Sequence, residues 1–328
     1  MKILILDSQQ IRELLPMRDC IELMADALAS LARGEVFQPL RTIIRPPEAR
    51  GLLGLMPAYR TGDHGAFGMK AICVFPGNPA IGKDAHQGAV MLFSRETGEM
   101  IALMNASEIT AIRTAAVSAV ATRLLAREDA NELAIIGAGV QARTHLAALA
   151  AVRSIKHARV ACRNIEHAYE IAREMQPRFS FPIEPVKTNE EAVRGADLIV
   201  TATSSQEPVI NKDWISPGAH VNAIGTHSPN SREIDSATMA ASRIFVDRRE
   251  SALNEAGDYL LAAKEGLIDA DSILAEIGEL LIGTKHGRNS VNEITLFKSL
   301  GLAIEDVACA EYLYQKALSQ DFGGWVSL

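Results

Sequence analysis

The sequence has little that would place the protein in a membrane, on a nucleic acid or around a metal ion. No apolar run among its 328 residues approaches the ~20 residues needed to span a bilayer. The net charge of −7 is spread along the chain without a basic block, which argues against nucleic-acid and anionic-membrane surfaces. The eight histidines show no pairing at metal-ligand spacing, so we expect no metal site.

Cysteine is scarce, and its spacing excludes the common cysteine-based architectures. Cys20, Cys73, Cys162 and Cys309 are far apart and form no Cys-x-x-Cys pair. This pattern favours buried thiols in a reducing compartment over disulfides or zinc. The opening segment Met1–Asp7 carries an acid too early for a secretory signal and is typical of a first strand. We therefore expect a cytoplasmic protein.

A glycine motif follows a short apolar run in the middle of the chain. Leu133–Ile136 is typical of a buried strand, and an Ala-rich stretch with helical spacing begins at Gln141. Gly137 permits a tight turn, Gly139 lets the backbone approach a diphosphate, and small Ala142 allows close packing of helix on strand. The diphosphate is then expected to bind N–H groups at the helix N-terminus.

Further buried strands follow the motif and alternate with helices. Gln141–Val152 and Glu166–Met175 have helical spacing. The later strands are predicted over Ala158–Arg163, Ala196–Thr203, Ala219–Gly225 and Arg243–Asp247. Strands that are apolar on both faces and alternate with helices indicate a parallel sheet covered on both sides. The sequence thus predicts an α/β protein with a Rossmann-type, doubly wound parallel sheet.

The end of the second strand of this sheet bears on the choice of cofactor. Cys162-Arg163-Asn164 has no Asp or Glu in the place that would bind a ribose 2′-hydroxyl. An arginine at this place is able to bind a 2′-phosphate instead. The sequence favours NADP(H), with NAD(H) as the alternative.

Residues 1–105 have a different pattern. One amphipathic helix is predicted over Met17–Arg33, and short alternating β segments follow it. These segments are Arg41–Arg45, Leu52–Tyr59, Ala66–Phe75 and Ala89–Asn105, the last with a hairpin turn at Glu96–Gly98. Short strands in hairpin succession predict an antiparallel or mixed sheet.

One long helix is predicted before the strands of the parallel sheet along the chain, and another is predicted after them. A long Ala-rich helix covers Ser107–Ala126, with Ser107 as the residue that caps its start. The pattern after the fifth strand predicts one long final helix over Thr295–Leu318 and a tail over Gln320–Leu328.

Three cations stand in apolar surroundings: Arg41, Lys70 and Arg113. A charged residue is rarely buried without a partner, and no acidic partner is evident beside any of the three. We therefore expect a site that binds an anion such as a substrate carboxylate. The alternative is that each side chain extends to the surface from a half-buried element.

The chain resembles the ornithine cyclodeaminase/mu-crystallin family. The segments that carry the resemblance are Gln38–Thr42, Gly51–Ala58, Arg113–Ala119, Ile136–Gln141, Pro217–Gly225, Arg232–Asp235 and Thr295–Gly301. They occur in the family's order and span nearly the whole chain. The likeness is greatest to the mu-crystallin branch, whose members act as NADPH-dependent ketimine reductases.

The resemblance implies a domain organisation and a small-molecule site. It implies that residues 1–126, completed by 296–328, bind the substrate and form a homodimer through an α+β domain. Residues 127–295 form the inserted Rossmann domain. The implied substrate ligands are Arg41, Lys70 and Arg113, and the implied cofactor ligands are Arg113, Thr114, Gly137, Gly139, Val140, Gln141, Arg163, Asn164, Thr203, Ala223, Ile224, Gly225 and Ser299.

Lys70 is implied to lie close to the reacting carbon of an imino or amino acid. It protonates the imine nitrogen or orients a water molecule that does so. An apolar pocket and two neighbouring cations are expected to lower the pKa of Lys70 toward neutrality, as acid–base work requires. The hydride itself comes from the nicotinamide.

His227 is a departure from the family pattern. Ornithine cyclodeaminases carry an Asp at this position, where it handles the terminal amine of the substrate. An imidazole titrates near neutrality, so His227 is a candidate catalytic residue; the alternative is a residue that lines the pocket without a proton role. His86 likewise either approaches the nicotinamide or lies at a strand edge.

Three functions remain open at this point. The first is NAD(P)H-dependent reduction of a cyclic ketimine or interconversion of an α-imino and an α-amino acid. The second is cyclodeamination of L-ornithine to L-proline and ammonia with NAD retained. The third is non-catalytic binding of a nucleotide or ligand.

Overall fold

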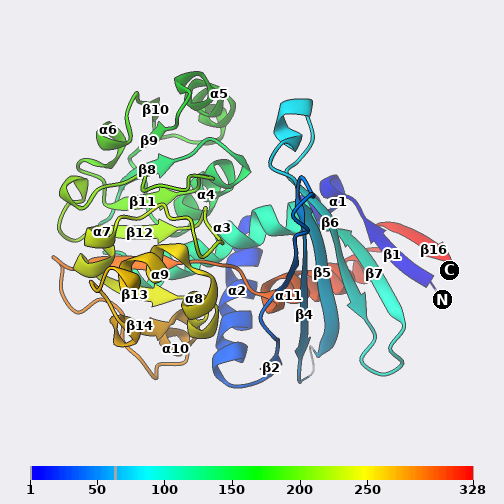
Figure 1. Ribbon diagram of the computed structural model, residues 1–328. Helices are drawn as coiled ribbons and strands as arrows, with labels where there is room; N and C mark the ends of the chain where they lie inside the picture. The colour runs from blue at the N-terminus through cyan, green and yellow to red at the C-terminus, as the bar shows by residue number, and fades with distance from the viewer. Residues whose placement is uncertain (1, 63–64, 328) are drawn as a thin grey trace. The chain divides into compact units, whose positions relative to one another are not determined.

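The computed structural model describes residues 2–62 and 65–327, so the expected first residue of the opening strand and the outermost residues of the expected first domain lie outside it. The chain divides into two compact units (Figure 1). Unit 1 comprises the chain up to Arg113 and from Gly301 onward, and unit 2 comprises Thr114–Leu300. The units thus divide within one helix, α3 (Ala106–Leu125), and after Leu300. The division of functions between domains stays a prediction.

Unit 1 contains a mixed sheet in the order β16-β1-β7-β6-β5-β4-β2, with β3 also paired to β4. The strands are β1 (Lys2–Leu6), β2 (Val36–Phe37), β3 (Thr42–Ile44), β4 (Leu52–Arg60), β5 (Ala66–Val74), β6 (His86–Phe93), β7 (Met100–Asn105) and β16 (Gly324–Ser327). Strand β1 is parallel to β7, whereas the β4-β5-β6-β7 pairs are antiparallel. The predicted mixed sheet is confirmed.

One long helix covers one face of this sheet, and a second long helix packs against the first. Helix α11 (Ala303–Gln320) packs against β4, β5 and β6 and against α2 (Met17–Ala32), while the short α1 is Ser8–Leu14 (Figure 1). Burial alternates along β4 and β5, as expected for strands with one covered face. A Cβ on Gly68 would lie 2.7 Å from a methyl group of Val307, so glycine lets α11 lie close to β5. Lys70 is two residues along β5 and shares this face.

The start of α3 differs from the prediction. Helix α3 begins at Ala106, and the side chain of Asn105 accepts the backbone N–H of Glu108 at 2.9 Å. The prediction that Ser107 caps the helix is therefore wrong, because the Ser107 hydroxyl donates instead to the backbone carbonyl of His86. Asn105 is as good an N-cap residue as serine, and because it lies two residues before Ser107, the helix starts at Ala106.

The C-terminal part of the chain also differs from the prediction. Thr295–Leu318 is not one helix: β15 (Ile294–Lys298) ends before α11 begins at Ala303. A short apolar run fits a buried strand and a buried helix equally well, and pairing of β15 with β12 and β13 decides for the strand. The prediction of a tail over Gln320–Leu328 is wrong for the described residues up to Ser327, because β16 pairs antiparallel with β1; Leu328 lies outside the described residues.

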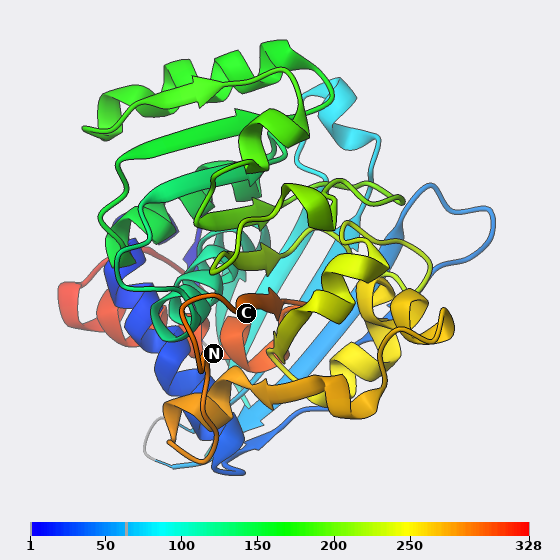
Figure 2. The ribbon, with the colours of Figure 1, turned by 90° about the vertical axis from the view of Figure 1, so that its left-hand side faces the viewer.

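Unit 2 contains a parallel sheet in the order β10-β9-β8-β11-β12-β15-β13-β14 (Figure 2). Its strands are β8 (Glu132–Ile136), β9 (His157–Ala161), β10 (Ile183–Pro185), β11 (Leu198–Thr201), β12 (His220–Ala223), β13 (Ser242–Val246), β14 (Ile273–Glu276) and β15. The helices are α4 (Val140–Val152), α5 (Ile165–Met175), α6 (Asn189–Val193), α7 (Ser236–Ala241), α8 (Arg249–Glu255), α9 (Gly257–Lys264) and α10 (Ile277–Leu281).

Hydrophobic cores lie on both faces of this sheet. Leu133 and Ile135 of β8 belong to one core with Leu146 of α4, and Ala134 and Ile136 belong to the other. Successive residues of one strand therefore face opposite cores, which is the arrangement of a doubly wound sheet. The predicted Rossmann-type fold is confirmed.

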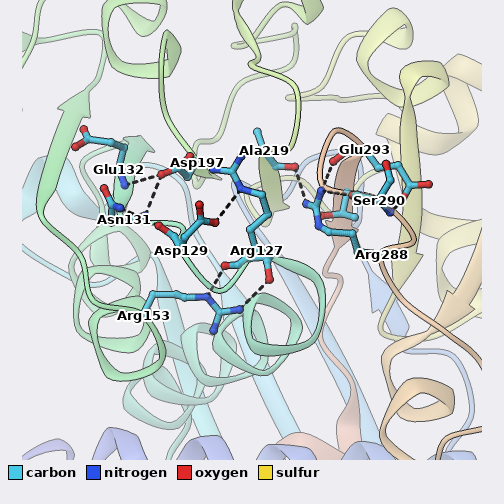
Figure 3. A network of polar contacts seen from close by, with 12 residues as sticks. Arg127, Asp129, Asn131, Glu132, Arg153, Asp197, Ala219, Arg288, Ser290 and Glu293 are labelled. Carbon is cyan, nitrogen blue, oxygen red and sulfur yellow. Dashed lines mark hydrogen bonds and ion pairs between the residues drawn. The ribbon is translucent and has the colours of Figure 1, made fainter.

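A polar network holds the amino ends of these strands together (Figure 3). The Asp197 carboxylate accepts the backbone N–H groups of Asn131 at 2.9 Å and Glu132 at 3.1 Å, and it pairs with Arg127. Arg288 donates to the carbonyl of Ala219 at 3.2 Å. These contacts fix the amino ends of the strands. Ligands of open α/β sheets bind at the other edge, beyond the carboxyl ends of the strands.

No helix within 2–62 and 65–327 is long and apolar enough to cross a membrane.

Candidate active site

The glycine motif lies where β8 ends and α4 begins in unit 2. Gly137 has φ +125°, and a Cβ there would lie 2.4 Å from the carbonyl oxygen of Ala202, so only glycine fits. Gly139 is the N-cap of α4, and nothing lies within 4 Å of where its Cβ would be. Open space in front of a helix N-terminus suits a diphosphate, because first-turn N–H groups and the helix dipole both attract an anion.

The next two strand ends are joined by one buried carboxylate. Glu233 accepts the backbone N–H groups of Thr203 at 2.7 Å and Gly225 at 2.6 Å, as well as the hydroxyl groups of Thr201 and Thr203. A Cβ on Gly225 would lie 2.1 Å from the carbonyl oxygen of Thr203, so the two segments touch. Burial raises the pKa of Glu233. Glu233 therefore sets the spacing of the loops after β11 and β12.

A buried ion pair between Asp258 and Lys298 holds the backbone at Glu233. The Asp258 carboxylate accepts the backbone N–H of Glu233 at 2.7 Å and lies 2.8 Å from the ammonium of Lys298. Burial works against the charge of Asp258, but Lys298 and the hydrogen bonds outweigh it and lower the pKa of Asp258. Lys298 also donates to the carbonyl of Thr226 at 2.9 Å. This pair fixes the segment that leads to His227.

The other cofactor residues implied by the sequence lie at the same edge of the sheet. Arg163 and Asn164 are exposed after β9, and Asn164 accepts the backbone N–H of Glu166 as the cap of α5. The backbone N–H of Ser299 donates to the carbonyl of Ala223 at 3.1 Å. The residues at this edge are Gly137, Gly139, Val140, Gln141, Arg163, Asn164, Thr203, Ala223, Ile224, Gly225, His227 and Ser299. Thr114 lies on α3, directly after Arg113.

Unit 1 brings the three predicted cations together with two acids. Lys70 is 2% exposed and Arg113 4% exposed. The Lys70 ammonium lies 2.8 Å from Asp306 Oδ2 and donates to the hydroxyl of Thr110 at 3.3 Å. Arg113 pairs with Glu305 at 2.6 Å and with Asp306 at 3.2 Å. We call Arg41, Lys70, Arg113, Glu305 and Asp306 the charged cluster.

Arg41 joins the charged cluster from the segment before β3. It donates to the carbonyl of Gly301 at 3.0 Å and is half-buried. Gly301 has φ +78°, and a Cβ there would lie 2.4 Å from a guanidinium nitrogen of Arg113. The glycine thus leaves room for the Arg113 side chain beside the segment that Arg41 holds.

The expectation that the cations lack acidic partners is wrong. Glu305 and Asp306 lie in the first turn of α11 and are both 0% exposed. They are missed because the prediction places them in the middle of a longer helix. The available signal is two adjacent acids in the apolar segment Leu302–Ala308, which is the same criterion that selects the cations.

The charged cluster shifts the pKa of its two buried cations in opposite directions. Burial lowers the pKa of Lys70 to about 8, with Arg113 and Arg41 adding to the effect and Asp306 opposing it. Burial also works against the charge of Arg113, but Asp306 and Glu305 outweigh it and raise the pKa of Arg113. Lys70 is thus a cation that is able to exchange its proton near neutral pH, whereas Arg113 is a fixed charge.

The structure also shows where the cysteines and the possible metal ligands of the sequence lie. Cys20 and Cys309 are buried with their sulfur atoms 4.0 Å apart, while Cys73 and Cys162 are half-buried, and all four are free thiols. Within the described parts of the chain, no group of three or more His, Cys, Asp or Glu residues is placed to hold a metal ion.

Comparison with known sequences shows which family the chain matches and which characterised proteins it is similar to. The model of the ornithine cyclodeaminase/mu-crystallin family matches residues 1–321. The Δ1-pyrroline-2-carboxylate reductase of Bacillus cereus is 40% identical over 321 residues, which cover 98% of each chain. The ketimine reductase mu-crystallin of Mus musculus is 38% identical over 291 residues, which cover 88% of each chain.

Two solved structures superimpose on nearly the whole chain. One is the Δ1-pyrroline-2-carboxylate reductase of Thermococcus litoralis in complex with NADH and L-proline, with 40% identity, 98% and 99% coverage of the two chains and a TM-score of 0.96. The other is an archaeal alanine dehydrogenase dimer with bound NAD, with 33% identity, complete coverage of both chains and a TM-score of 0.93.

Proposed function

The chain belongs to the ornithine cyclodeaminase/mu-crystallin family, and from this premise we propose that it reduces Δ1-pyrroline-2-carboxylate to L-proline. It is an NAD(P)H-dependent oxidoreductase that acts on the C–N bond of imino acids. The observation that carries the proposal is the charged cluster of unit 1. It holds three cations against two carboxylates, and one of the cations is a lysine with a pKa of about 8.

The charged cluster suits a substrate with one carboxylate beside an imine. Arg41 and Arg113 bind the carboxylate, because a guanidinium group is able to donate two parallel hydrogen bonds to it. The Lys70 ammonium donates a proton to the imine nitrogen, and the neutral amine then regains a proton from solvent. The bound nicotinamide supplies the hydride that adds to the carbon between nitrogen and carboxylate. One hydride and one proton convert C=N to CH–NH.

The residues of unit 2 suit the dinucleotide in this proposal. The N-terminus of α4 with Gly137 and Gly139 binds the diphosphate. The loops after β11 and β12, held by Glu233, bind the nicotinamide half of the cofactor. When the dinucleotide binds, it displaces water from both loops, and backbone groups of the loops take the place of the water molecules that hydrated the dinucleotide.

A substrate panel tests the proposed function. Wild-type protein is assayed with Δ1-pyrroline-2-carboxylate, its six-membered homologue and simple 2-oxo acids with ammonia or methylamine, each with NADPH and NADH. We expect stoichiometric loss of nicotinamide absorbance and formation of L-proline with the first substrate. Turnover restricted to a 2-oxo acid with ammonia would assign the protein as an amino-acid dehydrogenase instead.

Cyclodeamination of ornithine is the alternative, and position 227 argues against it. His227 supplies an imidazole where the family's cyclodeaminases carry a carboxylate, so the second ammonium group of ornithine lacks that anionic partner. We propose that ornithine is not converted at a useful rate. Proline and ammonia formed from ornithine with a catalytic amount of NAD and no net change in absorbance would establish the lyase.

We further propose that the enzyme prefers NADPH over NADH. Arg163 is exposed directly after β9, and no acidic residue occurs within residues 161–165. Arg163→Ala should raise the KM for NADPH roughly 10–100-fold and leave the KM for NADH nearly unchanged, because one charge-assisted contact contributes about 1.5–3 kcal/mol. Steady-state kinetics with both cofactors measures the effect.

Arg173→Ala is the matched control for Arg163→Ala. Arg173 is an exposed arginine in the last turn of α5, the helix that follows Arg163, and its replacement by alanine changes the net charge by the same amount. Its KM values for both cofactors should remain those of the wild type. A wild-type enzyme that uses NADH as efficiently as NADPH contradicts the proposed preference.

We also propose that the protein is a homodimer formed by the sheet of unit 1. The sheet face opposite α11 is apolar and only half-buried or exposed in the single chain. Its side chains are Leu53, Leu55, Pro57, Tyr59, Phe67, Met69, Ala71, Met91, Phe93, Ile101 and Leu103. An apolar face of this extent on a globular protein usually marks an interface. A two-fold contact covers it on both copies.

Met69→Asp should separate the dimer. Met69 is flanked on this face by Pro57 of β4 and Met91 of β6, so an aspartate there would be buried against apolar side chains of the second copy. Light scattering after size exclusion should give about twice the 35.4 kDa chain mass for the wild type and the chain mass for the variant. Leu267→Asp, at a side chain in unit 2 that is 51% exposed, is the control that stays dimeric.

A further inference from the structure

Asp306 occupies a place in the charged cluster that no other acid shares. It lies in the first turn of α11, where the helix dipole favours a negative charge, and its side chain is 0% exposed. Its two oxygens engage different cations: Oδ2 lies 2.8 Å from the Lys70 ammonium, and Oδ1 lies 3.2 Å from Nε of Arg113. Asp306 therefore links Lys70, the proton donor of the proposed reaction, to Arg113, which binds the substrate carboxylate in that proposal.

Glu305 is adjacent in sequence and equally buried, but its contact is different. Its carboxylate pairs with Nη1 of Arg113 at 2.6 Å, whereas the acid paired with Lys70 is Asp306. The two neighbouring acids thus divide the work: Glu305 fixes the guanidinium group, and Asp306 fixes both the guanidinium group and the ammonium. This difference makes Glu305 a matched comparison for Asp306.

We propose that Asp306 is a positioning residue that holds the Lys70 ammonium in place and keeps it protonated between turnovers. This inference rests on the proposed function, in which Lys70 donates a proton to the imine nitrogen. After the donation, the Lys70 amine is neutral and faces the carboxylate of Asp306. That carboxylate favours the return of the proton from solvent, because an ammonium beside it is more stable than an amine.

The groups that face Lys70 support this role. Arg113 and Thr110 face it from α3, Arg41 from the segment before β3, His86 from β6 and Asp306 from α11.

Asp306 is the only anion among those five groups. Burial and the two arginines lower the pKa of Lys70, and the ion pair with Asp306 limits the fall to about 8. The pKa of His86 is lowered, first by burial and then by Lys70 and Arg113, so His86 adds little charge at neutral pH. Without the Asp306 carboxylate, Lys70 would face only cations and neutral groups.

The first test is Asp306→Asn, which removes the charge and keeps the size of the side chain. The pKa of Lys70 should fall below about 8, so the descending limb of the kcat/KM profile should move to lower pH. The kcat should fall by about 10²-fold at pH 8 and by less at pH 6, where more of the lysine is protonated. The ¹³Cε resonance of Lys70, assigned with Lys70→Arg, reports the same pKa in protein without substrate or cofactor.

Glu305→Gln and Asp306→Glu complete the test. Glu305→Gln should raise the substrate KM through Arg113 and leave the Lys70 titration where it is in the wild type. Asp306→Glu keeps the charge but displaces it, so the titration should return toward the wild type while kcat remains lowered. These two variants carry the test if Asp306→Asn does not fold.

The outcomes separate this inference from the proposed function. A Lys70 titration that is equal in the wild type, Asp306→Asn and Asp306→Glu overturns the positioning role, even if the enzyme reduces Δ1-pyrroline-2-carboxylate. An equal shift in Glu305→Gln and Asp306→Asn also overturns it, because the effect then belongs to the buried charge in general. A wild-type protein without activity on any imino acid refutes the proposed function and leaves the titration result standing.

Discussion

Lys70→Ala should lower kcat by about 10²–10⁴-fold, the usual loss when an acid–base group is removed. The KM for the substrate should change far less, since Arg41 and Arg113 remain to bind the carboxylate. Steady-state kinetics with Δ1-pyrroline-2-carboxylate measures both constants. A Lys70→Ala variant with near-normal turnover would remove Lys70 from the mechanism and leave it as a buried ion-paired lysine.

The pH profile and Lys70→Arg sharpen this result. In the proposed reaction the ammonium is the proton donor, so kcat/KM of the wild type should fall as the pH rises through about 8, the pKa of Lys70. Arginine keeps a positive charge beside Asp306 but does not release its proton in this range. Lys70→Arg should therefore bind substrate and still lose most of its turnover. Equal turnover in Lys70→Arg and the wild type would show that charge alone suffices.

Arg113→Ala should damage both substrate binding and folding. Loss of a buried charge that pairs with a ligand costs about 2–5 kcal/mol, which raises the KM at least tenfold. The variant also leaves Glu305 and Asp306 buried with one cation fewer, which lowers the free energy of unfolding by about 3–5 kcal/mol. Kinetics gives the first effect and the midpoint of urea unfolding gives the second.

Arg41→Ala is the comparison for Arg113→Ala. Arg41 is half-buried and donates to the carbonyl of Gly301, so its loss leaves neither acid of the charged cluster without an ion pair. The KM should rise while the urea midpoint changes little. The limb of the pH profile should move to higher pH in both variants, because each arginine lowers the pKa of Lys70. A normal KM in Arg113→Ala would exclude the arginine as a substrate ligand.

Features with a short-range cause were predicted well. The strand predicted over Leu133–Ile136, the turn at Gly137 and the helix predicted from Gln141 depend on neighbours within a few residues. The structure has all three, with the strand and the helix each starting one residue earlier than predicted. The alternating segments of unit 1 likewise carry their own period of two. Segments whose structure depends on a distant partner were predicted wrongly: β15 is a strand because β12 and β13 pair with it, and β16 because β1 does.

The same division holds for the site. The sequence by itself determined that a glycine turn follows β8 and that three cations stand in apolar segments, because glycine turns and charge in an apolar run are local properties. It did not determine that Glu305 and Asp306 neutralise two of those cations. Arg113 is separated from the two acids by 192 and 193 positions along the chain, and no local pattern encodes that pairing.

Only the tertiary structure decided which charges meet. Packing of α11 on the sheet of unit 1 brings its first turn against Lys70 and Arg113, and pairing of β12 with β15 brings Lys298 to Asp258. Burial then makes each ion pair strong enough to set a pKa, because charges interact more strongly away from water. The residue types that carry the chemistry are local to the sequence, but the proton affinity of Lys70 depends on the fold that surrounds it.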